Sequence, residues 1–136
     1  SAVCVGVAER LVEESLRYTM ERKQFGAPLA EHQLVQAMLA DSKTEAYAGK
    51  TMVMDAARRK DDGENVSTLA SCCKLFCAEM VGRVADRAVQ VHGGAGYMSE
   101  YAVERFYRDV RLFRIYEGTT QIQQLVIARN MVREAS

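Results

Sequence analysis

Two long stretches of helical periodicity constrain this chain of 136 residues more than any other feature. From about Val66 to His92, apolar side chains recur at intervals of three and four residues. The members of this stripe are Leu69, Cys73, Phe76, Met80, Val84, Ala88 and Val91. A second such segment runs from about Glu31 to Lys60. At 1.5 Å per residue each helix would be roughly 40 Å long, which favours an up-and-down bundle over compact globin-like packing.

The remaining segments are also predicted to be helical or to connect helices, and no alternation of apolar and polar residues indicates a strand. Gly26 and Pro28, the only proline, mark a break between the first and second helices. The expected segments are a helix over Ala2–Arg22, a break over Lys23–Ala30, a short helix over Glu100–Leu112, a loop over Phe113–Gly118 and a last helix over Thr119–Glu134. We therefore expect an all-α fold, an up-and-down four-helix bundle with an additional short helix, forming one domain over residues 1–136.

Within these helices the sequence makes smaller predictions. In the first helix, Val5, Ala8, Leu11 and Leu16 are among the apolar positions. Gly63 is the expected C-terminal cap of the second helix. On the third helix, Glu79 and Arg83 stand four residues apart and could form an ion pair. Before the last helix, Thr120 and Gln123 have the spacing of a capping box, with Thr120 at the N-cap.

Composition excludes several classes of function. Eighteen basic and 18 acidic residues give a net charge of zero, which argues against a nucleic-acid groove or a basic membrane-surface helix. No stretch approaches the roughly 20 apolar residues of a membrane span. The opening residues Ser1–Val5 include neither an initiator Met nor a signal-type segment, so we expect the chain to be a segment or processed product of a longer protein. The four cysteines, three of them within six residues, are expected to be free thiols.

Three motifs could carry chemistry, and each has a structural alternative. Arg22, in the run Arg22–Gly26, could bind a phosphate through its guanidinium or could only stabilise the end of a helix. The glycines of Gln90–Tyr97 could allow a ligand close to the backbone or could only form a cap and a turn. Glu117 could be a base, because a carboxylate removed from water is a stronger one, or it could be an exposed loop residue.

Other candidates favour structural interpretations. Cys72, Cys73 and Cys77 are followed by no second set of metal ligands, so we expect no metal site and assign these cysteines to the core. His32 and His92 have no carboxylate at a spacing that indicates a catalytic dyad. The four arginines that recur every third residue from Arg105 to Arg114 could bind phosphate, but pairing with Glu104 and Asp109 or plain solvation is favoured.

Taken together and in order, these motifs resemble the C-terminal domain of the acyl-CoA dehydrogenases. The matching segments are Arg22–Gly26, Glu31–Gln33, Gln90–Tyr97, Tyr107–Asp109 and Tyr116–Gln123. Each is weak alone, but five at suitable separations over nearly the whole chain are highly specific. The resemblance implies that the N-terminal helical domain and the middle β-domain of the family are absent from this chain, and that the chain alone lacks a complete site.

The resemblance also implies an activity, the α,β-dehydrogenation of an acyl-CoA thioester. Glu117 matches the catalytic base, which removes the Cα proton while a hydride leaves Cβ for N5 of FAD. Gly118 matches a position lining the thioester pocket. The residues that match FAD contacts are Arg22, His32, Gln33, Gln90, Val91, His92, Gly93, Gly94, Thr119 and Gln121. In the family, the position matching Arg22 reaches FAD bound mainly to a neighbouring subunit.

The implied partners are an acyl-CoA substrate, other copies of the protein in a tetramer or dimer, and an electron-transfer flavoprotein as electron acceptor. The expected location is the cytoplasm for a bacterial protein and the mitochondrial matrix for a eukaryotic one. Two alternatives stay open: a non-catalytic helical oligomerisation module, and an acyl-CoA oxidase that passes its electrons to oxygen. Chain length and branching of the acyl group cannot be read from these residues.

Overall fold

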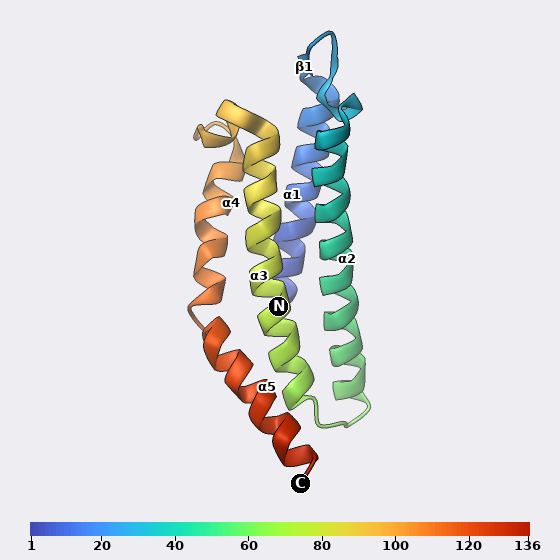
Figure 1. The fold of residues 1–136 in the computed structure, drawn as a ribbon, viewed down its shortest axis with the longest axis vertical. Helices are drawn as coiled ribbons and strands as arrows, with labels where there is room; N and C mark the ends of the chain where they lie inside the picture. Colours follow the sequence, from blue (N-terminus) through green and yellow to red (C-terminus); the bar gives the residue numbers. More distant parts are fainter.

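A computed structural model of the chain describes residues 1–136 and contains three long, consecutive, antiparallel helices (Figure 1). They are α1 (Ala2–Glu21), α2 (Gln33–Asp61) and α3 (Ser67–His92), of 20, 29 and 26 residues. The lengths confirm that the periodic stretches form long helices. Between α2 and α3, Gly63 adopts a φ of +84°, which confirms its predicted role at the end of α2.

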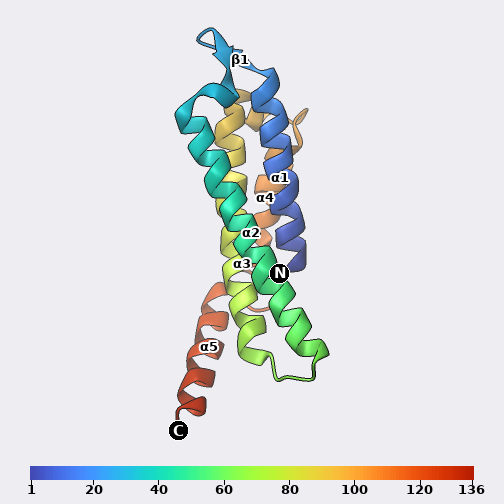
Figure 2. The same ribbon diagram turned by 90° about the vertical axis from the view of Figure 1, so that its right-hand side faces the viewer.

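The fourth position of the bundle is shared by two shorter helices, α4 (Ala102–Arg111) and α5 (Thr120–Glu134). Figure 1 shows them following one another along α3, with α4 beside the C-terminal half of α3 and α5 beside its N-terminal half. Figure 2 shows α5 extending past the start of α1, so the four-helix section is confined to the half of the bundle that contains α1 and α4. The all-α bundle with an additional short helix is confirmed.

Helix α3 lies at the centre of the core. Met80, Val81 and Val84 are almost completely buried on it, where they meet Leu11 of α1 and Val103 of α4. Each buried aliphatic side chain of this size stabilises the fold by about 1.5–3 kcal/mol. Most of the predicted stripe of α3 is thus confirmed as its core-facing side, since five of its seven residues are buried and only Leu69 and Phe76 are half-buried.

The cysteines are free thiols, as predicted. Cys4, Cys73 and Cys77 are buried, and burial raises the pKa of the Cys77 thiol to about 11. A thiol with such a pKa stays protonated at neutral pH and is a poor nucleophile. These cysteines therefore fill space in the core.

The break between α1 and α2 differs from the prediction, because it contains a small β-hairpin. Strands β1 (Lys23–Gln24) and β2 (Ala27–Pro28) pair in antiparallel register. The two residues between them, Phe25 and Gly26, have φ values of +54° and +83°. Positive φ at both central residues is the geometry of a type I′ turn, the tightest hairpin connection. Strands of two residues are too short to produce the alternation on which a sequence prediction depends.

Short 3₁₀ helices complete the connections: Leu29–Glu31 before α2, Gly93–Tyr97 after α3 and Leu112–Arg114 after α4. Accordingly α2 begins at Gln33, two residues later than predicted.

The predicted N-cap of the last helix is wrong by one residue. The side chain of Thr119, not of Thr120, accepts the hydrogen bond from the Ile122 backbone N–H at 3.3 Å. The Thr120 hydroxyl instead donates to Glu79 of α3, a contact that no local pattern specifies.

Candidate functional site

A cavity of about 570 Å³ lies where the end of α1, the hairpin and the end of α3 meet. Arg22 lines it from the end of α1, and residues 90–94 line it from the end of α3. These are six of the ten residues that the resemblance assigns to FAD: Arg22, Gln90, Val91, His92, Gly93 and Gly94. The fold therefore brings together two groups of predicted cofactor residues that are far apart in the sequence.

The Arg22 side chain and the backbone of Gly93 and Gly94 are accessible to a ligand in this cavity. The Arg22 side chain is exposed and forms no ion pair within the chain, although its backbone N–H still caps α1 through the Tyr18 carbonyl at 2.9 Å. Gly93 has a φ of +59°, and a Cβ placed on Gly93 or Gly94 would have no heavy atom within 4 Å. A free guanidinium beside bare backbone suits a phosphate-bearing ligand.

His92 is held between two tyrosines at the edge of the cavity. Its ring stacks on Tyr18 at a centroid distance of 4.2 Å and meets Tyr101 nearly edge-on at 6.0 Å. His92 Nδ1 lies 2.7 Å from the Ala88 carbonyl oxygen, so Nδ1 carries the proton and Nε2 is the acceptor in the neutral ring. Burial is the main reason that the pKa of His92 is lowered from its ordinary value of 6.5.

The lowered pKa of His92 predicts a pH dependence of stability. Below pH 6.5 the unfolded chain takes up a proton on this histidine before the folded chain does, so the free energy of unfolding should fall as the pH decreases from about 7 through 6.5. Urea unfolding at a series of pH values measures the effect. His92→Asn keeps a hydrogen-bond donor but does not titrate, so it should flatten the profile in this range. An unchanged profile in the variant would contradict the assignment.

A second cavity of about 570 Å³ adjoins the first and shares Leu29 and Val35 with it. His32 and Gln33 line it, together with Phe25 at the hairpin tip. The His32 Nε2 atom lies 3.2 Å from the Gln24 carbonyl oxygen, which ties the start of α2 to the hairpin. The Phe25 side chain is 95% exposed. Sequence reasoning gave Phe25 no role, since its exposure follows from a turn that was not predicted.

Glu117 lies elsewhere, in the loop between the 3₁₀ helix that ends at Arg114 and helix α5 (Figure 1). Glu117, Gly118, Thr119 and Gln121 line neither of the two cavities. Within this chain, the predicted base and two of the predicted cofactor residues are thus separate from the other eight. The Glu117 side chain is exposed.

The backbone of this loop is unusual. Glu117 has a φ of +54° and Gly118 a φ of +86°, and Glu117 and Phe25 are the only non-glycine residues with positive φ. Such a conformation costs on the order of 1–3 kcal/mol for a residue with a side chain and recurs at functional sites. The backbone N–H groups of Glu117 and Gly118 find no acceptor within the chain, while the Gln123 amide donates to the Glu117 carbonyl at 3.3 Å.

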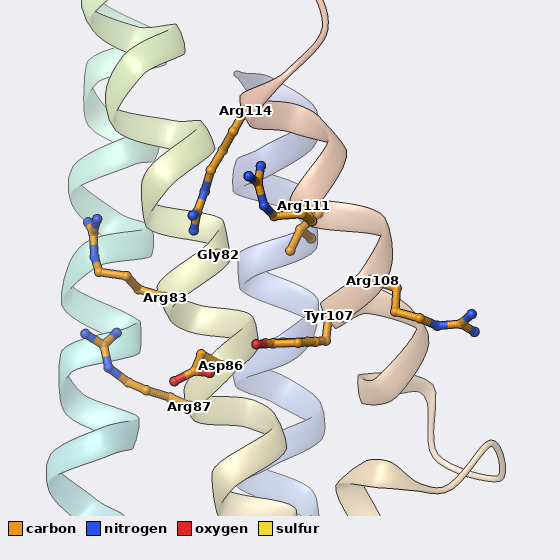
Figure 3. Close-up of a pocket in the computed structure, with 9 residues that line it drawn as sticks. Gly82, Arg83, Asp86, Arg87, Tyr107, Arg108, Arg111 and Arg114 are labelled. Carbon is orange, nitrogen blue, oxygen red and sulfur yellow. The ribbon is translucent and has the colours of Figure 1, made fainter. Parts of the chain in front are cut away.

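A third cavity, of about 720 Å³, is a groove between α3 and α4 lined by five arginines and Asp86 (Figure 3). Most of these arginines already have carboxylate partners. Arg83 and Arg87 bind Glu45 of α2 at 3.1 Å, so the predicted pair of Glu79 with Arg83 is wrong. Arg108 binds Glu104 at 3.1 Å, one of the pairings predicted for the arginine run. Figure 3 shows Arg83 and Arg87 pointing toward α2 and Arg108 pointing out of the groove, so the guanidinium groups do not converge on one point.

The structure contains neither a group of possible metal ligands nor a helix suited to cross a membrane. No three His, Cys, Asp or Glu side chains lie close enough together to hold a metal ion. None of the helices combines the length and the apolar character needed to cross a membrane.

Comparisons with known proteins agree with the motifs. Residues 1–132 match the model of the "Acyl-CoA dehydrogenase, C-terminal domain" family. The chain is 44% identical over 135 residues to cyclohexane-1-carbonyl-CoA dehydrogenase of Geobacter metallireducens, covering 99% of this chain and 36% of that protein. It is 43% identical over 130 residues to subunit CarC of the caffeyl-CoA reductase-Etf complex of Acetobacterium woodii, covering 96% of this chain and 34% of that protein.

A solved structure shares the fold. An acyl-CoA dehydrogenase from Geobacillus kaustophilus superposes with a TM-score of 0.92 at 37% identity, over 94% of this chain and 34% of that one. The chain thus spans about a third of the length of the relatives that it matches. A family match over nearly all residues, a shared fold and the motifs in register lead to one conclusion: the chain belongs to the acyl-CoA dehydrogenase family of flavoenzymes and corresponds to its C-terminal helical domain.

Proposed function

We propose that this domain is part of an FAD-dependent enzyme that removes hydrogen from Cα and Cβ of an acyl-CoA thioester, with Glu117 as the base. The observation that carries the proposal is the conformation of the Glu117 loop. The backbone of Glu117 is left-handed, and the N–H groups of Glu117 and Gly118 have no acceptor within the chain. A strained residue at the position that matches the family's base supports a catalytic role.

Glu117 would remove the proton on Cα. The α-proton of a thioester is weakly acidic, so the base must lie within hydrogen-bond reach of it and in a site from which water is excluded. In this chain the Glu117 side chain is exposed. The relatives are about three times as long as this chain, and we assign the cover over Glu117 to the protein outside these residues.

The same loop would stabilise the charge that develops on the thioester oxygen. Removing the α-proton gives an enolate, which backbone N–H donors stabilise when they point at the oxygen. The free N–H of Glu117 is suited to this role, and Gly118 would line the pocket around the thioester. A side chain at position 118 would overlap the Gln123 amide, since a Cβ there would lie 2.5 Å from Gln123 Nε2.

The residues around the two cavities fit a dinucleotide cofactor. Arg22 would bind the pyrophosphate, and the open backbone at Gly93 and Gly94 would face the adenosine side. Gln90, Val91, His92, His32 and Gln33 would contribute the remaining contacts there, and Thr119 and Gln121 would contact the cofactor at the start of α5. Bound FAD would supply the acceptor for the hydride that leaves Cβ.

The separation of the two groups supports a homo-oligomer, a tetramer or a dimer. The group at the hairpin end would contact FAD held mainly by a neighbouring subunit, while Glu117 would face the cofactor of its own subunit. Helix α5 has no buried residue, and Ile122, Leu125, Met131 and Val132 are exposed on it, as expected for a surface that the rest of the assembly covers.

A divided site predicts that the 136-residue chain alone binds FAD weakly or not at all, because Arg22 and Glu117 face different cofactors. Equilibrium dialysis of the chain against FAD measures this directly. A tight complex with one FAD per chain would contradict the division. Circular dichroism of the same sample would confirm that the chain is folded.

The activity is tested in the full-length flavoprotein by adding saturated acyl-CoA thioesters without oxygen. We expect loss of the oxidised-flavin absorbance, followed by reoxidation with an electron-transfer flavoprotein. In a parallel assay in air, rapid oxygen consumption would instead indicate an acyl-CoA oxidase. No bleaching with any thioester would favour the oligomerisation module. One relative is named a subunit of a caffeyl-CoA reductase-Etf complex, so reduction of an enoyl-CoA should be assayed as well. In that direction the protonated Glu117 would return the proton to Cα. For a bacterial protein we propose the cytoplasm as its location, and for a eukaryotic one the mitochondrial matrix.

A further inference from the structure

Both ends of the Glu117 loop are tied to one carboxylate on α3. Arg114, the last residue of the 3₁₀ helix before the loop, places its Nε 3.3 Å from Glu79 Oε2. Thr120, the first residue of α5 after the loop, donates its hydroxyl to Glu79 Oε1 at 2.7 Å. The two oxygens of Glu79 therefore hold the two ends of the loop.

This contact is partly withdrawn from water. The Glu79 and Arg114 side chains are 32% and 29% exposed, so neither is fully open to solvent. Screening is weaker for such a pair than for a fully exposed one. A second contact reinforces it, because the Lys74 ammonium donates to the carbonyl of Phe113, one residue before Arg114.

Gly82 makes room for the contact. A Cβ on Gly82 would overlap the Arg114 guanidinium, whose atoms are the three nearest to that position. Figure 3 shows the Arg114 side chain reaching across to α3 beside Gly82. Glycine is unfavourable in the middle of a helix compared with alanine, so its presence in α3 needs a reason, and the Arg114 guanidinium supplies one.

Few contacts within the loop reach Glu117 itself. Tyr116 stacks on Phe113 with ring centroids 5.8 Å apart, and its N–H donates to the Leu112 carbonyl at 3.3 Å. Gln123 is the only residue whose side chain hydrogen-bonds to the backbone of Glu117 or Gly118. The Glu117 carboxylate forms no ion pair. The contacts at the two ends of the loop therefore contribute to holding Glu117 in its left-handed conformation.

We infer that Glu79 is a positioning residue: through Arg114 and Thr120 it fixes the direction of the Glu117 carboxylate. The inference rests on the proposed role of Glu117 as the base. A displacement of about 1 Å in a reacting group can lower a rate about a hundredfold, so a residue that holds the loop ends has a measurable effect on catalysis.

The test is the rate of flavin reduction by acyl-CoA in a single turnover of the full-length flavoprotein. Glu79→Ala removes both ties, and we expect that rate to fall roughly ten- to hundredfold with unchanged FAD content. Glu79→Gln keeps an oxygen for Thr120 but no charge for Arg114, so its rate should lie between those of the wild type and Glu79→Ala. Glu104→Ala is the matched control, because it breaks a comparable glutamate–arginine pair on α4 away from the loop, and its rate should stay within about twofold.

Gly82→Ala separates positioning from stability. It displaces the Arg114 guanidinium while giving α3 a better helix former, so we expect a slower rate together with an unchanged or higher unfolding temperature. A purely structural contact would not make these two measurements move in opposite directions.

The outcomes distinguish this inference from the proposed function. One outcome is wild-type flavin reduction in the Glu79→Ala and Gly82→Ala variants, together with slow flavin reduction in the Glu117→Gln variant. That outcome would overturn the positioning role and leave the base assignment standing. If Glu117→Gln also reduces the flavin at the wild-type rate, the base assignment fails and the positioning role fails with it.

Discussion

Glu117→Gln should abolish most of the activity of the full-length flavoprotein while leaving FAD bound. The substitution preserves the size of the side chain and removes the only group in the loop that can accept the α-proton. Loss of a general base lowers a rate by about 10²–10⁴-fold, which at the upper end corresponds to about 5 kcal/mol of activation free energy. The measurement is the single-turnover rate of flavin bleaching by a saturated acyl-CoA under anaerobic conditions.

Two controls make this result specific. Glu100→Gln changes another exposed glutamate, in the turn before α4, and should leave the rate unchanged. The flavin content of both variants, measured after release of the cofactor, should equal that of the wild type. Bleaching of Glu117→Gln at the wild-type rate would show that another group removes the proton.

Leu11→Ala should produce the largest loss of stability among single truncations of α1. The Leu11 side chain is fully buried and borders a small internal space together with Met38 of α2 and Val84 of α3. Both of those helices are fixed by other contacts, so the space left by the substitution cannot collapse completely. Truncation of a buried leucine in such a setting costs about 3–5 kcal/mol. Urea unfolding of the chain measures the change in the free energy of unfolding.

Leu16→Ala is the matched control, because it is the same substitution on the same helix. The Leu16 side chain is 47% exposed, and its truncation should cost about 1 kcal/mol or less. Equal losses for the two variants would mean that the core of the chain in solution differs from the one described above.

Leu11 and Leu16 also show how far the apolar positions of a helix indicate which of its side chains are buried. Both were apolar positions of the first predicted helix, but only Leu11 belongs to the buried stripe. The stripe continues through Ser15 and Thr19, which are buried although they are polar. The Thr19 hydroxyl satisfies its hydrogen bond on the Leu16 carbonyl, so its burial requires no apolar character. Apolarity alone therefore does not distinguish the buried positions of this helix from the exposed ones.

The sequence motifs named some residues of the candidate site and missed others. The motifs named Glu117 and eight of the residues that line the two cavities, but they gave no sign that Phe25 would stand exposed at a hairpin tip or that Tyr18 would stack on His92. These features arise where α1, the hairpin and α3 meet. Contacts between residues far apart in the chain leave no spacing pattern that a single sequence displays.

The sequence by itself determined the number of long helices, their approximate ends and the face of α3 that is buried, because helix periodicity, caps and glycine breaks act over a few neighbouring residues. The tertiary structure alone decided which charges pair between helices. Glu79 stands four residues from Arg83 on its own helix, yet it binds Arg114 and Thr120, while Arg83 binds Glu45 of α2. The physical reason is that an exposed pair within one helix contributes only a few tenths of a kcal/mol, so a better placed partner on a neighbouring helix replaces it once the helices pack.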